Sequence, residues 1–367
     1  MSRFIIIFCF WEDSEPGMRI EQLTFTRFIA AIAIVIYHYG TDIFPFRLPY
    51  LAYIFKAADV GVSYFFILSG FVMIIAYGDK PRVNTAQYFK NRAARIYPVY
   101  LVALLLVTGY YMLRGWSVDS NALGLNLLVL QAWLPPYPLS LNYPGWSLAV
   151  ELFFYALFPL LFNRFYTKAS LKKVVAIVFV IWAVSQMVFL FLLHSNFYKG
   201  FPSESNDFLF YFPVLHLNQF LVGNVAGLVF KRYSSQPKNY DVWLVALVII
   251  LAALLRLPNP RIFHDGLLAL LFIPFIYLVC LNTGVITSFF RSKPLVFFGE
   301  ISYGIYILQY PAFLLAKDFV DFFHLQSKTV AFAVFLLFLL LMASLSYLII
   351  EVPLRNKIKR MGAVRAT

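Results

Sequence analysis

The stretch RFIAAIAIVIYH (27–38) carries residues that could do chemistry at its two ends. Arg27 could bind phosphate oxygens, and His38 could accept a proton near neutral pH. Over eleven residues an α-helix turns by about 1100°, so the two side chains lie about 20° apart, with a rise of roughly 16.5 Å between them. The spacing therefore predicts both groups on one face of a helix. In the alternative, Arg27 only anchors the helix at lipid phosphates and His38 lies at the outer interface.

A carboxylate follows in NYPGWSLAVELFFYALFPL (142–160), where Glu151 lies five residues after Trp146. If this span begins at Trp146, Glu151 lies about 7.5 Å inside the apolar stretch, where a carboxylate needs a partner. We expect His38 to be that partner, because a carboxylate bound to one imidazole nitrogen raises the basicity of the other. Asp42 could hold His38 instead, and Glu151 could form a structural ion pair with another cation.

Basic residues also begin the stretch NRAARIYPVY (91–100). Arg92 and Arg95 are three residues apart and share a helix face. Together with Lys90 and Arg27 they could bind the phosphates of a cofactor. On the residues alone, ordinary anchoring of these cations at the cytoplasmic surface is the stronger interpretation.

Two further stretches, GVSYFFILSGF (61–71) and GEISYGIYILQYP (299–311), place small and hydroxyl-bearing residues inside apolar runs. Such residues allow helices to approach closely, which is their default interpretation. They would also let a ligand come near a cavity.

The composition indicates which elements must position these groups. The 367 residues are 62% hydrophobic and 13% charged, whereas soluble domains are about 45–50% apolar and about 25% charged. The apolar runs are continuous and near the length of a bilayer crossing, which predicts an all-α integral membrane protein and disfavours a β-barrel. The two cysteines, Cys9 and Cys280, predict neither a disulfide nor a metal site.

Ten transmembrane helices are expected, and the distribution of positive charge supports this count. If both termini are cytoplasmic, 22 of the 30 Lys and Arg residues lie on the inner side. The run 122–134 is then a short re-entrant or interfacial segment, because a crossing there would reverse every later loop. Topology accounts for most of the +13 net charge, so no nucleic acid partner is expected. The predicted spans are 24–39, 58–77, 97–113, 146–163, 174–193, 208–230, 241–256, 266–281, 299–316 and 329–350.

The domain organisation is simple. We expect one membrane domain over 18–356, followed by a basic cytoplasmic tail at 357–367. Residues 1–17 are interpreted as an N-terminal extension of doubtful role or an interfacial flap, and the sequence leaves open whether Met1 or Met18 is the start.

Seven sequence motifs, which follow one another in order along the ten predicted helices, resemble those of the integral-membrane acyltransferase type 3 family. The resemblance extends from about residue 20 to residue 356. Members of that family modify surface polysaccharides, peptidoglycan, lipid-linked sugars and some small molecules. Ser63 and Gln309 depart from the family pattern, which often has an acidic residue and a histidine there. The motifs are Arg27-x10-His38, GVSYFFILSGF, RAAR (92–95), WSLAVE (146–151), QFLVG (219–223), GEISYGIYILQYP and EVPLR (351–355).

The resemblance implies residue roles. His38 matches the catalytic histidine, and Arg27, Arg92 and Arg95 match arginines that engage the acyl donor, acyl-CoA. Glu151 falls at a motif position and is expected to act with His38. Other site candidates, with less defined roles, are Asp42 and the motif residues Ser69, Trp146, Ser147 and Tyr303, of which Ser147, Trp146 and Tyr303 could stabilise an oxyanion.

The implied activity is transfer of an acyl group, acetyl above all, from cytosolic acetyl-CoA to a hydroxyl of a surface polysaccharide or lipid-linked glycan. His38 would be the general base, with an acyl-histidine intermediate as the alternative. No metal is expected. The expected surroundings are the lipids of the bacterial plasma (inner) membrane, and the oligomeric state, a homodimer included, stays open. The competing interpretations are a transporter or flippase for lipid-linked glycans, because intramembrane charges also mark solute paths, and a different membrane acyltransferase fold.

Overall fold

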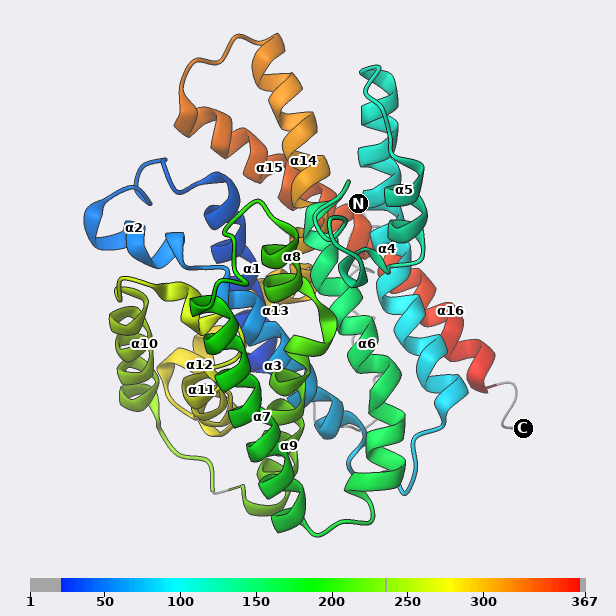
Figure 1. The fold of residues 1–367 in the computed structure, drawn as a ribbon, viewed down its shortest axis with the longest axis vertical. Coiled ribbons are helices and arrows are strands. Elements are labelled where there is room, and N and C mark those ends of the chain that lie inside the picture. Colours follow the sequence, from blue (N-terminus) through cyan, green and yellow to red (C-terminus); the bar gives the residue numbers. More distant parts are fainter. Residues whose placement is uncertain (1–20, 235, 364–367) are drawn as a thin grey trace, which may run out of the picture.

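The computed structural model describes residues 21–234 and 236–363, and nearly all of its regular structure is helical (Figure 1). The predicted extension 1–17 lies outside these residues. The α-helices are α1 (Glu21–Tyr39), α2 (Pro49–Lys56), α3 (Val60–Tyr77), α4 (Thr85–Leu113), α5 (Ser120–Leu127), α6 (Trp146–Leu161), α7 (Leu171–His194), α8 (Glu204–Tyr211), α9 (Leu217–Tyr233), α10 (Asp241–Leu255), α11 (Ala269–Leu281), α12 (Val285–Phe290), α13 (Lys293–Glu300), α14 (Ser302–Phe322), α15 (Lys328–Ser346) and α16 (Val352–Ala363).

Within the described residues, seven helical segments are long and apolar enough to cross a membrane. This confirms the prediction of an all-α chain with several membrane spans, while the count of ten and the cytoplasmic termini stay predictions. The segments are Glu21–Tyr39, Val60–Tyr77, Thr85–Leu113, Tyr143–Tyr166, Leu171–His194, Glu204–Tyr233 and Lys328–Lys357.

Three predicted spans differ from these segments. The spans expected at 241–256 and 266–281 are the helices α10 and α11, with 15 and 13 residues, whereas a crossing needs about 17–25. The span expected at 299–316 begins later, because α13 ends at Glu300 and the 21-residue α14 begins at Ser302. The Ser302 hydroxyl donates to the carbonyl of Gly299 at 2.7 Å, a local bond of the kind that competes with helix continuation.

The run 122–134 does not form a long helix. It contains the end of the eight-residue α5 and a 3₁₀ turn, Gln131–Trp133, both too short to span. The chain leaves α4 and enters α6 at the same end of the bundle, because Tyr111 and Tyr143 both contact Tyr310 of α14. The segment between α4 and α6 therefore returns to the end from which it started, as the charge pattern predicts.

Helices α1 and α14 run in the same direction. Near one end Arg27 of α1 lines a cavity with Ser302 and Tyr303 of α14, and further along His38 of α1 contacts Gln309 of α14. We call these the arginine end and the histidine end of the bundle. Both predicted groups of α1 thus face the same neighbouring helix, as their spacing predicts.

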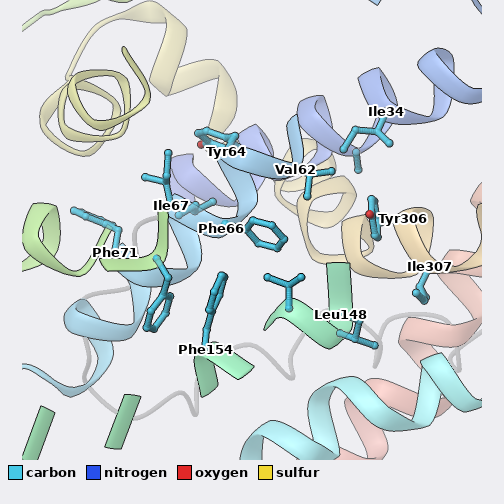
Figure 2. Close-up of a cluster of buried hydrophobic side chains, with 14 of the residues drawn as sticks. Ile34, Val62, Tyr64, Phe66, Ile67, Phe71, Leu148, Phe154, Tyr306 and Ile307 are labelled. Carbon is cyan, nitrogen blue, oxygen red and sulfur yellow. The ribbon is translucent and has the colours of Figure 1, made fainter. Parts of the chain in front are cut away.

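The packing of α3 against α9 fixes the position of one wall of the site. A Cβ atom at Gly223 would lie 2.1 Å from the carbonyl oxygen of Ile67, and one at Gly70 would lie 2.2 Å from that of Phe220. Only glycine allows two helix backbones to approach so closely. Figure 2 shows the apolar core beside this contact, where Phe66 of α3 lies near Phe154 of α6.

Candidate active site

Seven of the sequence-predicted site residues line one cavity of about 120 Å³ between α1, α3, α4, α6 and α14. The cavity wall also contains apolar side chains from the core of Figure 2, such as Phe66 and Leu148. Helix packing therefore brings together polar groups that are far apart in the sequence. The seven residues are Arg27, Ser69, Arg92, Arg95, Ser147, Glu151 and Tyr303.

The charge in this cavity is unbalanced. Three of its lining residues are arginines, and Glu151 is the only acidic residue among the described residues that line it. Arg95 is exposed and also lines the cavity, so a ligand can reach the cavity from the arginine end. Glu300 and Glu351 act electrostatically on these arginines from outside the lining, and the positive surplus of the lining itself is what favours an anionic ligand.

Arg92 is held in a cage of aromatic rings. Its guanidinium lies 5.9, 5.7 and 5.5 Å from the ring centroids of Tyr77, Tyr88 and Tyr155, distances typical of cation–π contacts. The helix that carries Arg92, α4, begins at a cap, because Asn84 accepts a hydrogen bond from the backbone N–H of Gln87 at 3.1 Å. Nε of Arg92 is buried and finds no hydrogen-bond partner among the described residues. The cage therefore fixes a cation that still has a free donor.

Glu151 is bound by two hydroxyl groups rather than by a histidine. Tyr155, one helical turn further along α6, donates to Oε1, and Ser69 of α3 donates to the same oxygen at 3.3 Å. Tyr155 lines the cavity too. Sequence reasoning missed it, although its spacing of four residues from Glu151 was a usable signal.

His38 has a different partner from the one expected. Its Nδ1 lies 2.7 Å from Oε1 of Gln309, and its ring contacts the edge of Tyr143 at 4.9 Å between centroids. Tyr143 precedes Glu151 by eight residues, which corresponds to roughly 12 Å along a helix. The pairing of His38 with Glu151 was wrong because the two groups lie at different depths. His38 is exposed and is not one of the cavity-lining residues.

Two hydroxyl groups lie at the boundary between the cavity and the histidine end. The hydroxyl of Ser147 has a single proton and two acceptors within reach, the hydroxyl of Tyr306 at 2.9 Å and the backbone carbonyl of Pro144 at 3.1 Å. Tyr306 lines the cavity, one turn of α14 before Gln309. Sequence reasoning missed Tyr306, although it lies within GEISYGIYILQYP. The hydroxyl of Tyr303 is already committed to the carbonyl of Ile96 at 2.7 Å.

Two predicted candidates lie outside this arrangement. Trp146 begins α6 but is not a cavity-lining residue; its ring packs against His216 and His264, with centroids 5.5 and 6.1 Å away. Asp42 is exposed in the turn that follows α1, which ends at Tyr39. The structure brings neither residue to the cavity.

Comparison with known proteins adds a family to this geometry. Residues 20–351 match a family model described as an acyltransferase domain. The acyltransferase MdmB of Streptomyces mycarofaciens is 27% identical over 320 residues, which is 80% of this chain and 79% of that protein. The O-acetyltransferase OatA of Staphylococcus aureus is 22% identical over 393 residues. That match takes in 94% of this chain but only 60% of the length of OatA. No solved structure matches the chain.

Proposed function

The chain belongs to the acyltransferase type 3 family, and on this premise we propose that it is a membrane O-acyltransferase that uses acyl-CoA. Acetyl-CoA is the expected donor, and the acceptor is a hydroxyl of a surface polysaccharide or lipid-linked glycan at a bacterial plasma membrane. The names of MdmB, an acyltransferase, and OatA, an O-acetyltransferase, support acyl transfer as the reaction.

The observation that carries the proposal is the cavity with three arginines. Guanidinium groups match phosphate oxygens, and Arg27, Arg92 and Arg95 all line this cavity. With about 120 Å³, the cavity is smaller than the roughly 300–1,000 Å³ of pockets that enclose a drug-sized ligand. It suits the acyl group and the adjoining part of the pantetheine arm, with the nucleotide phosphates at the arginine end.

In the proposed reaction, His38 accepts the proton of the acceptor hydroxyl. The oxygen forms a bond to the thioester carbonyl carbon, the C–S bond breaks, and the departing thiolate takes the proton back from His38. Assistance of this kind contributes a factor of about 10²–10⁴ to the rate. The rise of roughly 16.5 Å from Arg27 to His38 separates the donor phosphates from the chemistry.

Tyr306 is the proposed donor to the oxyanion that forms during transfer. Tyr306 lines the cavity, and when its oxygen accepts the hydrogen bond from Ser147 its own proton can serve the oxyanion. Loss of one such donor lowers kcat by about 10²–10³-fold in a well-studied protease. The catalytic role of Glu151 stays a proposal as well. Its bonds to Tyr155 and Ser69 hold it in the cavity wall, where it faces the donor rather than the imidazole.

The test is an assay of the purified full-length protein in detergent with labelled acetyl-CoA and candidate glycans. We expect label on a glycan or released by hydrolysis, and a loss of about 10²-fold or more in His38→Ala. His194→Ala is the matched control, because His194 is also exposed but lies at the end of α7. Full activity of His38→Ala, or no label transferred or released by the unmodified protein, would contradict the proposal.

The role of Tyr306 has its own control. Tyr306→Phe should lower kcat by about 10²-fold. Tyr100→Phe also removes a buried phenol hydroxyl, which donates to the backbone carbonyl of Asn126 at 2.8 Å. Tyr100 is not a cavity-lining residue, so this variant should keep kcat within about twofold of the unmodified protein. Equal kcat values for the two variants would exclude Tyr306 as the oxyanion donor.

A further inference from the structure

We propose that Gln309 is the positioning residue that fixes the tautomer of His38, so that Nε2 is the nitrogen that accepts the proton of the acceptor hydroxyl. The inference rests on the proposed function, because it names the atom of His38 that acts in that reaction. It assigns a role to a residue at which this chain departs from the pattern of the family it resembles.

The first step concerns the orientation of the Gln309 amide. Its Nε2 lies 2.7 Å from the backbone carbonyl oxygen of Tyr306. A carbonyl oxygen only accepts hydrogen bonds, so the NH₂ group must point towards Tyr306 and Oε1 towards His38. Gln309 is fully buried, so water cannot take over either bond. The amide therefore has one orientation that satisfies both contacts.

The second step concerns the imidazole. Oε1 of Gln309 lies 2.7 Å from Nδ1 of His38, and an amide oxygen can only accept. Nδ1 must therefore carry a proton. A neutral imidazole has a single N–H, so Nε2 has the free lone pair that a general base needs.

The third step concerns the other groups around the ring. Apart from Gln309, the described groups that face His38 are the phenols of Tyr37 and Tyr39 on α1 and of Tyr143 just before α6. Asp59, just before α3, acts on the ring electrostatically. The ring contacts of the tyrosines are edge contacts, and Gln309 supplies the side-chain hydrogen bond to Nδ1. Gln309 is therefore the group that selects the tautomer.

The chemical consequence is specific. A neutral amide orients the imidazole without adding a negative charge beside it, whereas a carboxylate at the same position would also stabilise the protonated ring. Histidine acts as a base only when it is neutral. A carboxylate at position 309 should therefore move the rising limb of the activity profile to higher pH.

The experiment compares Gln309→Leu and Gln309→Glu in the full-length protein, with kcat and the KM for acetyl-CoA measured across pH. For Gln309→Leu we expect kcat to fall by about 10–100-fold while KM stays within about twofold, because the tautomer is no longer selected. For Gln309→Glu we expect measurable activity with the rising limb shifted upward by about one pH unit. Thermal unfolding in detergent checks that each variant is folded.

Gln186→Leu is the matched control, since Gln186 is a buried glutamine whose side chain donates to the carbonyl of Asp265 at 2.8 Å. This control should keep the pH profile of the unmodified protein. A Gln309→Leu variant with unchanged kcat at every pH, or a Gln309→Glu variant with an unshifted limb, would overturn the inference. If His38→Ala is inactive at the same time, only the role of Gln309 fails and the proposed function stands.

Discussion

The hydroxyl of Tyr155 donates a hydrogen bond to Oε1 of Glu151, four residues earlier on α6. The ring of the same tyrosine lies 5.5 Å from the guanidinium of Arg92. One side chain thus binds the carboxylate of the cavity and packs against one of its cations. The two functions can be separated, because the hydroxyl serves the first and the ring serves the second.

Tyr155→Phe should remove the hydroxyl while keeping the ring beside Arg92. A hydrogen bond to a charged group contributes about 1.5–3 kcal/mol to stability. Without it the carboxylate is no longer held in place, and we expect kcat/KM to fall by at most about 10–100-fold, the factor to which that energy corresponds. Steady-state kinetics with acetyl-CoA provides the measurement. Tyr166→Phe is a suitable control, because the buried hydroxyl of Tyr166 has no partner among the described residues. Equal losses in both variants would show that the bond to Glu151 has no functional effect.

Arg92→Lys should weaken donor binding although it keeps the positive charge. Lysine lacks the planar fork that matches phosphate oxygens, so we expect the KM for acetyl-CoA to rise by about tenfold with a smaller change in kcat. Lys90→Ala serves as the control, since Lys90 lies two residues away, is exposed and is not a cavity-lining residue. An Arg92→Lys variant with unchanged KM would remove Arg92 from the donor site.

Gly223→Ala should destabilise the bundle by several kcal/mol, because the new Cβ would lie 2.1 Å from the Ile67 carbonyl oxygen and force α3 and α9 apart. Gly109→Ala makes the same change inside α4, where no atom lies within 4 Å of the new Cβ. There we expect a gain of up to about 1 kcal/mol, since alanine favours a helix more than glycine does. Thermal unfolding of both variants in detergent gives the comparison, and similar midpoints would refute the backbone contact.

The predicted orientation in the membrane can be measured with single cysteines, after Cys9 and Cys280 are replaced by serine. Ser117 and Thr167 are both exposed, and they lie in loops at opposite ends of α6. With the termini in the cytoplasm, Ser117→Cys should react with a membrane-impermeant maleimide in intact cells, whereas Thr167→Cys should react only after permeabilisation. The reverse pattern would place the arginine end outside the cell.

Local spacing in the sequence predicted much of the site. Arg27 and His38 face the same helix because eleven residues complete nearly three turns, and such periodicity depends on one helix alone. Arg92, Arg95 and Glu151 were each named from motifs, and the structure brings them into one cavity. Their roles stay predictions.

The pairing of His38 with Glu151 could not be predicted from the sequence, because partners on different helices depend on depth and rotation together. His38 lies beside Tyr143, before α6 begins, whereas Glu151 lies further along that helix. The actual partner, Gln309, was visible only as a departure from the family pattern. The division between α13 and α14 was missed for a similar reason, since a hydrophobic run does not indicate where a serine hydroxyl, here that of Ser302, bonds a nearby backbone carbonyl.

Ser147 and Tyr306 line the cavity, and His38, which contacts Gln309 one turn further along α14, is not among its lining residues. The hydrogen bond between the two hydroxyls joins α6 to α14 at this level. A water-filled passage from one surface of the bundle to the other would conduct protons and dissipate the electrochemical gradient across the membrane. A hydrogen-bonded contact at this level would keep water out of that route, so the proposed acyl transfer would not require a proton leak between the arginine end and the histidine end.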